Sequence, residues 1–145
     1  MYQLSPPYFF EFANFKHRQV FEDCPFPWEA LPKIEKYLHS LVLGDIQVDI
    51  PNDVHLVNPE LISIGKGTVL EPTAYIKGPC VIGENCVIRH GAYIRGNLVA
   101  GDQCVIGHDT EVKNSIFFNK AQAAHFAYVG DCILGNGVNL GAGVK

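Results

Sequence analysis

The sequence lacks any long apolar run and any large excess of charge of either sign. No stretch approaches the roughly 18 consecutive apolar residues that a membrane-spanning helix needs, so we expect no membrane insertion. Eleven basic and fifteen acidic side chains give a net charge of -4, which argues against a general surface for nucleic acid. The first residues carry no basic segment ahead of an apolar run, and we therefore expect a cytoplasmic protein.

The five cysteines form no C-x-x-C pair, and their number is odd. A disulfide framework and a finger-type zinc site are therefore not expected. What the chain does have is enough apolar sequence, 48% of 145 residues, for one buried core with a short extension. Fourteen glycines and nine prolines indicate many turns.

Apolar residues recur at every sixth position. Steps of six reach Ile64, Leu70, Ile76, Ile82, Ile88, Ile94, Ala100, Ile106, Val112, Phe118 and Ala124. The positions two residues earlier are mostly small and include Cys80, Cys86 and Cys104, which we interpret as compact packing residues. A period of six fits neither an α-helix nor an open alternating sheet, but it fits short strands bent at regular corners. We therefore predict an all-β protein, a parallel β-helix built from hexapeptide repeats.

The pattern divides the chain into two regions. Residues 1–50 are expected to form an aromatic arm and a helix, and residues 51–145 the β-helix. Residues 27–41 carry an apolar helical face, expected to pack on the coils or on a neighbouring subunit. We expect residues 2–26, rich in Phe, Tyr and Pro, to lie on a partner surface. The repeat still runs at the last residues, so we expect a β-helix that is truncated at its C-terminus or covered there by another chain.

Three basic residues are spaced by 18, which is one coil if three hexapeptides make a coil. Lys77, Arg95 and Lys113 should then lie in single file, about 4.8 Å apart. Like charges at that distance repel each other, and a bound anion such as a phosphate would be stabilising. The alternative reading of this spacing is a solvated face whose side chains extend into water.

His125 is a candidate general base. It follows Ala124 near a break in the period, because the apolar series resumes at Val129 and not at residue 130. We therefore expect one residue to be lost between Ala124 and Val129. Together with Tyr128, His125 could supply a base and a hydroxyl partner, although a single histidine is more often structural.

Two further histidines, His90 and His108, are also 18 apart and could stack as metal ligands. The neighbouring positions of their column are Pro72 and Phe126, which offer no third ligand. We therefore expect no metal site.

Residues 111–114, 124–131 and 137–143 resemble the acetyltransferase domain of the bifunctional N-acetylglucosamine-1-phosphate uridylyltransferase/glucosamine-1-phosphate acetyltransferase. The similarity covers about a third of the chain. It implies a left-handed β-helix with three hexapeptides per coil, and a homotrimer with sites between adjacent subunits. It also implies transfer of an acetyl group from acetyl-CoA to an amino sugar phosphate such as glucosamine-1-phosphate, in the synthesis of UDP-N-acetylglucosamine.

The resemblance also assigns roles to individual residues. It places the phosphate on Arg95, the substrate on Lys113, the general base on His125, the sugar on Tyr128 and Asn139, and the coenzyme at Ala142. Lys77 is a further candidate for substrate binding because its spacing places it in the same file.

The chain departs from this family in two respects. The family's later coils, which carry most of the coenzyme channel, have no counterpart here, so the resemblance leaves acetyl-CoA binding by these 145 residues open. The family's uridylyltransferase domain also has no counterpart in these residues, because the leading residues are too few for a nucleotide-binding fold and contain no glycine-rich loop. The alternatives are a non-catalytic β-helix for oligomerisation or sugar-nucleotide binding, and a protein related to nucleotidyltransferases (pyrophosphorylases) by descent.

Overall fold

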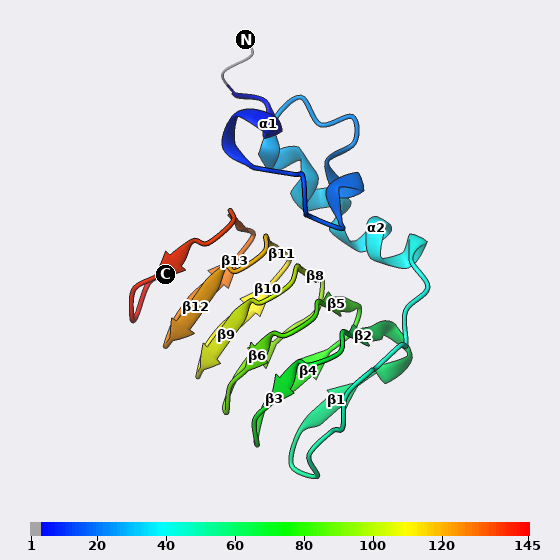
Figure 1. Ribbon diagram of the computed structural model, residues 1–145, viewed down its shortest axis with the longest axis vertical. Helices are drawn as coiled ribbons and strands as arrows, with labels where there is room; N and C mark the ends of the chain where they lie inside the picture. The colour runs from blue at the N-terminus through cyan, green and yellow to red at the C-terminus, as the bar shows by residue number, and fades with distance from the viewer. Residues whose placement is uncertain (1–3) are drawn as a thin grey trace.

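Short strands alternate with tight corners from His55 to Leu140 and stack into three parallel sheets (Figure 1). The computed structural model describes residues 4–145. Sheet A contains β2 (Ile62–Ile64), β5 (Cys80–Ile82), β8 (Leu98–Ala100), β11 (Ser115–Phe117) and β14 (Ile133–Leu134). Sheet B contains β1 (His55–Val57), β4 (Tyr75–Lys77), β7 (Tyr93–Ile94), β10 (Glu111–Lys113) and β13 (Tyr128–Gly130). Sheet C contains β3 (Val69–Leu70), β6 (Val87–Ile88), β9 (Val105–His108), β12 (Gln122–His125) and β15 (Asn139–Leu140).

The chain visits the sheets in the order A, C, B, so that one coil contributes one strand to each sheet. Neighbouring strands pair in parallel. The paired residues are 18 apart in the coils from β2 to β10, as in Ile64 with Ile82 and Ile76 with Ile94, and 17 apart in the later coils, as in Ile116 with Ile133. The predicted parallel β-helix is therefore confirmed.

The interior of the prism is the main apolar core. Its aliphatic column runs from Ile64 to Val112 as the six-residue period predicted, and Cys80, Cys86 and Cys104 are buried there as free thiols. Beyond Val112 the prediction is wrong, because the core residues are Phe117 and Ala123 and not their successors in the sequence, Phe118 and Ala124. Phe118 belongs to a second core outside the coils.

That second core lies between sheet A and residues 5–43. The arm contains α1 (Pro6–Phe9), the 3-10 helices η2 (Arg18–Phe21) and η3 (Pro27–Lys33), and α2 (Ile34–Ser40). A further 3-10 turn, η4 (Pro59–Leu61), follows β1. The predicted helix is therefore present, although its first half, which contains Pro32, is a 3-10 helix.

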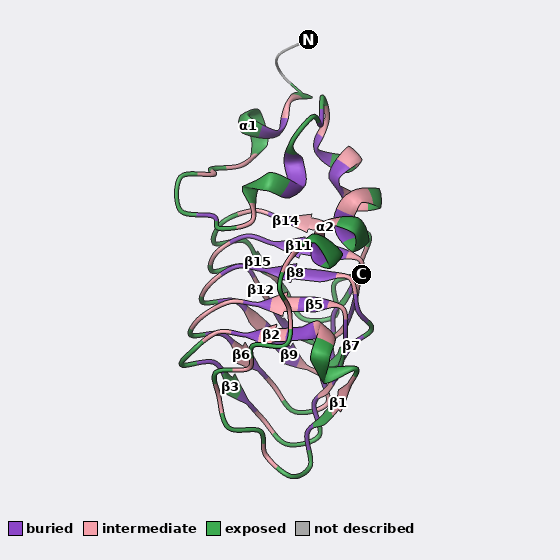
Figure 2. Ribbon diagram, turned by 90° about the vertical axis from the view of Figure 1, so that its right-hand side faces the viewer, coloured by how far each residue is buried: buried purple, intermediate pink, exposed green. Residues whose placement is uncertain are grey.

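The arm packs on sheet A of its own chain, so the helix lies on the coils, which was one of the two expected positions, and the contact of the arm with a partner stays a prediction. Helix α2 lies against β8, and η3 lies against β14. The buried side chains of this interface include Phe15, Val99, Ile116 and Phe118. In Figure 2, β8 and β11 beneath the arm are coloured as buried, and β5 as partly buried. Residues 2 and 3 of the predicted arm lie outside the described part. No helix formed by residues 4–145 is long and apolar enough to cross a bilayer.

Candidate functional site

Lys77, Arg95 and Lys113 lie in single file on the outside of sheet B. Lys77 ends β4, Arg95 follows β7 and Lys113 ends β10, and the residues that precede them are partners in register. We call these three residues the cation file. The spacing of 18 in the sequence therefore predicted their alignment correctly.

Two members of the cation file are already paired with carboxylates. Nη1 of Arg95 lies 3.4 Å from Oε2 of Glu111, and Nζ of Lys113 lies 2.7 Å from Oδ2 of Asp131. The hydrogen bond from Lys113, reinforced by one from Asn114, lowers the pKa of Asp131, and the same pairing raises the pKa of Lys113. Within residues 4–145, Lys77 forms no ion pair. An anion bound here would join Lys77 or compete with Glu111 and Asp131.

Tyr128 reaches toward the cation file from the next coil. Gly130 is the register partner of Lys113, and the ring of Tyr128 lies across it: a Cβ added to Gly130 would be 2.7 Å from the Tyr128 hydroxyl oxygen. Gly130 therefore leaves room for the tyrosine. The structure places Tyr128 beside Lys113, whereas the sequence had suggested it as a partner of His125.

The one-residue break lies at a different corner from the one we predicted. Val112 pairs with Ile94, 18 residues earlier, but Ser115 pairs with Leu98, 17 residues earlier. A residue is therefore missing at the corner that follows Lys113 and not between Ala124 and Val129. The corner one coil later, at Asp131, is equally short, because Ile116 pairs with Ile133, 17 residues later. In the earlier coil this corner has two residues with positive φ, Gly96 (102°) and Asn97 (51°), whereas Asn114 (43°) turns the later one alone.

Moving the break changes the column that His125 occupies. His125 pairs in register with His108, the position in which we expected Phe126. The rings of His90 and His108 are stacked with centroids 5.3 Å apart, and His108 and His125 meet edge to face at 5.2 Å. We call this column the imidazole ladder. Aligning residues 90–95, 108–113 and 125–130 would have found it, because each segment begins with His and has an aliphatic residue four positions later.

His125 is exposed and lies at the corner between sheets C and B. The imidazole ladder and the cation file therefore flank sheet B, one at each end of its strands, with Tyr128 between them. In residues 4–145 no group of three or more His, Cys, Asp or Glu side chains is arranged to hold a metal ion.

Asn139 and Ala142 lie elsewhere on the prism. Asn139 begins β15 opposite Gln122 and is exposed on the outside of sheet C, and Ala142 is exposed beyond that strand. The predicted site residues thus occupy two faces and the corner between them. One chain does not enclose them in a single cleft.

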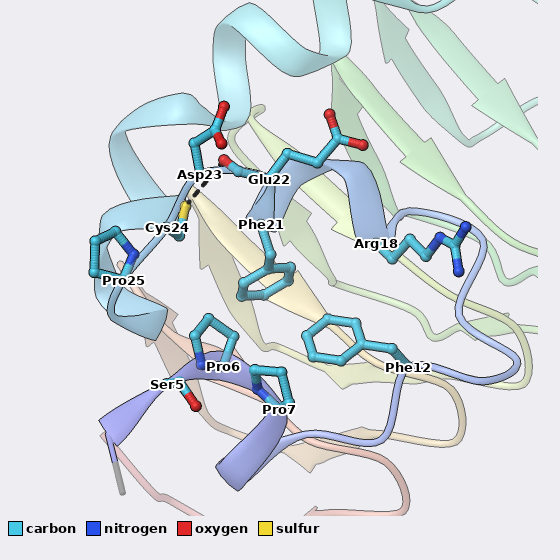
Figure 3. Close-up of a pocket in the computed structure, with 10 residues that line it drawn as sticks. All are labelled: Ser5, Pro6, Pro7, Phe12, Arg18, Phe21, Glu22, Asp23, Cys24 and Pro25. Atoms are coloured by element: carbon cyan, nitrogen blue, oxygen red, sulfur yellow. Dashed lines mark hydrogen bonds between the residues drawn. The ribbon is translucent and has the colours of Figure 1, made fainter. Parts of the chain in front are cut away.

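A large hollow lies in the arm, where the sequence suggested no chemistry. It measures about 900 Å³ and opens between α1 and η2 (Figure 3). Its lining is mainly apolar, with charged side chains at the rim, and consists of Ser5, Pro6, Pro7, Phe12, Arg18, Phe21, Glu22, Asp23, Cys24 and Pro25. None of the predicted site residues contributes to it. The Phe- and Pro-rich composition of the arm is the only signal in the sequence that points to this hollow.

Comparison with known families finds a match in the later coils of the solenoid and none in the arm. Residues 76–145 match the family model described as "GMPPB C-terminal domain", which represents a β-helix domain of sugar nucleotidyltransferases. No curated protein matches the chain. The match covers just under half of the chain, and it includes Arg95, Lys113 and His125 but not the arm. From β4 onwards the chain is therefore similar to a nucleotidyltransferase-related β-helix.

Proposed function

We propose that the outer face of sheet B binds an amino sugar phosphate and that the protein acetylates its amino group with acetyl-CoA. One observation carries this proposal: an exposed imidazole, His125, and a file of cations flank the same sheet, with Tyr128 between them. Cations on a rigid sheet suit a phosphate, and an exposed imidazole suits proton removal near neutral pH.

In this reaction the substrate's nitrogen attacks the carbonyl carbon of the thioester. The new N–C bond forms as the C–S bond breaks, His125 accepts the proton lost by nitrogen, and that proton returns to the coenzyme thiolate. Arg95 and Lys113 hold the phosphate and Tyr128 orients the sugar. The base contributes about 10²- to 10⁴-fold, and alignment of the reactants supplies the rest.

The positions of Asn139 and Ala142 favour a site completed by a second copy of the chain. Both residues lie beyond the corner that carries His125, on the side away from the cation file. A neighbouring subunit in a homotrimer would bring its sheet C against sheet B and so place Asn139 opposite Arg95 and Lys113. Ala142 would then lie beside the acetyl-CoA chain.

The test is an acetyl-transfer assay with acetyl-CoA and glucosamine-1-phosphate. We expect His125→Ala to lower kcat by about 10²- to 10⁴-fold. His39→Ala, which changes an exposed histidine on α2, is the matched control and should stay close to the unsubstituted protein. Equal activity of the two variants would contradict the proposal, as would the absence of turnover in a folded trimer.

A second candidate is a sugar-nucleotide-binding module without catalysis. It is favoured by the match to a domain of sugar nucleotidyltransferases and by the carboxylates that already neutralise Arg95 and Lys113. Calorimetry with UDP-N-acetylglucosamine distinguishes the two candidates. Binding that His125→Ala leaves intact, in a protein without acetyl transfer, would favour the module.

A further inference from the structure

Two rings of the imidazole ladder, those of His90 and His108, have no role in the proposed reaction. His108 is the middle ring. It is stacked on His90 with an interplanar angle of 18°, and it meets His125 at 75° with centroids 5.2 Å apart. Because His108 and His125 are register partners on adjacent strands, the parallel ladder fixes their backbones relative to each other. His108 is therefore positioned to constrain the ring of His125.

Phe126 also contacts the ring of His108. Its centroid lies 4.4 Å from that of His108 at an angle of 73°, an edge-to-face arrangement. Phe126 is more than half exposed and has a φ of +48°, a left-handed conformation that bulky residues rarely adopt. Such backbone persists where the surroundings over-determine it. The contact with His108 and the hydrogen bond from Phe126 N to His108 O are two such constraints.

We propose that His108 is a positioning residue for His125. The ring of His108 packs edge to face against the imidazole of His125. It also packs against Phe126, the residue that follows His125 at the corner. An exposed histidine without such support moves among its rotamers within nanoseconds and spends little time in a reactive geometry. The catalytic meaning of this role rests on the proposed function, but the ordering of the ring does not.

Three variants separate ring packing from other roles. His108→Ala removes the support, and His108→Phe keeps a flat ring without its nitrogens. His90→Ala is the matched control, because its ring stacks on His108 and lies one coil further from His125 than His108 does. Thermal melting first establishes that each variant is folded.

The ring protons of His125, read by NMR in protein labelled at histidine, report positioning without any turnover. We expect His108→Ala to move the His125 signals toward those of a free histidine, and His108→Phe and His90→Ala to leave them displaced by the neighbouring ring. In the acetyl-transfer assay, His108→Ala should lower kcat about tenfold with KM nearly unchanged, and His108→Phe should recover most of that loss.

His125 signals that do not move in His108→Ala would overturn the proposal. It would also be overturned if His108→Phe disturbed them as much as His108→Ala did, because the ring's shape would then not be what matters. If the unsubstituted protein transfers no acetyl group, the proposed function fails while the NMR comparison still decides whether His108 orders His125.

Discussion

Sheets A and B belong to the same coils, yet their outer faces differ completely. On sheet A the outward residues of successive strands are Val81, Val99, Ile116 and Ile133, and the arm covers them. On sheet B the corresponding residues are Tyr75, Tyr93, Glu111 and Tyr128, which face solvent at least in part. The inward residues of both sheets are small or aliphatic apart from Phe117 of sheet A.

The difference shows which positions of a β-helix repeat are free to vary. Inward positions must fill the prism, so they differ little between sheets. Outward positions have no such constraint, and they decide whether a face becomes a packing surface or stays available for a ligand. Four experiments test this comparison, from the largest expected effect to the smallest.

Removing the central ring of the covered face should cost most. Phe118 is fully buried and stacks on Phe15 and Phe10, with centroids 4.0 and 4.8 Å away. We expect Phe118→Ala to lower the free energy of unfolding by about 3–5 kcal/mol, measured by chemical denaturation. Tyr93→Ala on sheet B, where the side chain is exposed, should change it by less than about 1 kcal/mol. Similar losses in the two variants would mean that the faces do not differ as described.

Acid should destabilise the covered face through His17. Burial lowers the pKa of His17 to about 4, and its Nδ1 lies 2.9 Å from the Tyr37 hydroxyl, whose own pKa burial raises to about 12. Because the folded pKa is below the ordinary value of about 6.5, the unfolded chain binds the proton first as the pH falls. No stability is lost above pH 6.5, and about 3 kcal/mol is lost between pH 6.5 and pH 4.

The matched variant for this pH effect is His17→Phe, which keeps a ring against Phe15 but cannot titrate in this range. Denaturation midpoints measured from pH 7 to pH 4 should fall more steeply in the unsubstituted protein than in the variant. Parallel curves for the two proteins would show that His17 does not contribute to the acid sensitivity.

Removing the carboxylate that pairs with Lys113 should strengthen anion binding on the exposed face of sheet B. Asp131→Asn keeps a side chain suited to the φ of 53° but removes the charge that holds Lys113. We expect severalfold tighter binding of inorganic phosphate, measured by calorimetry at low and at moderate salt. The melting temperature should be unchanged. Asp109→Asn makes the same change at the corner on the other side of sheet B and should have no such effect.

Removing the ion pairs between Lys16 of the arm and the coils should change the free energy of unfolding least. Lys16 reaches Asp102 at 3.2 Å and Glu84 at 3.6 Å, but its side chain is 57% exposed. Lys16→Met should therefore cost less than about 1 kcal/mol of unfolding free energy, because solvent screens exposed ion pairs. A loss as large as that of Phe118→Ala would mean that charge and not apolar packing holds the arm.

The sequence predicted the solenoid because filling a narrow prism imposes a strict period on the inward residues. The prediction failed after Val112, where one fewer corner residue changes the phase. Phe118 and Ala124 are apolar for other reasons, so the count by six continued without a visible error. The covering of sheet A could have been read from its apolar outward residues, such as Val99 and Ile116, but the fold of the arm depends on contacts that no local pattern encodes.

The cation file was predictable for the same reason as the core, since residues one coil apart must align. Its ion pairs were not, because the carboxylate that pairs with Lys113 comes from Asp131, which turns the left-handed corner one coil later. His125 was singled out as a candidate base, but the rings beside it were not predicted. Its contact with His108 became apparent only once the position of the missing residue was known.

The short corner after Lys113 has a consequence for comparing this chain with its relatives. Deleting a residue there leaves the cross-section of the prism intact and renumbers everything that follows, so equivalent positions are defined by coil and side, not by distance along the chain. An alignment should place its gaps where the chain turns, because a gap within a strand would move an interior side chain into water. A deletion at a corner can thus change which exposed residues are aligned on the outside of a solenoid, while the interior side chains stay in place.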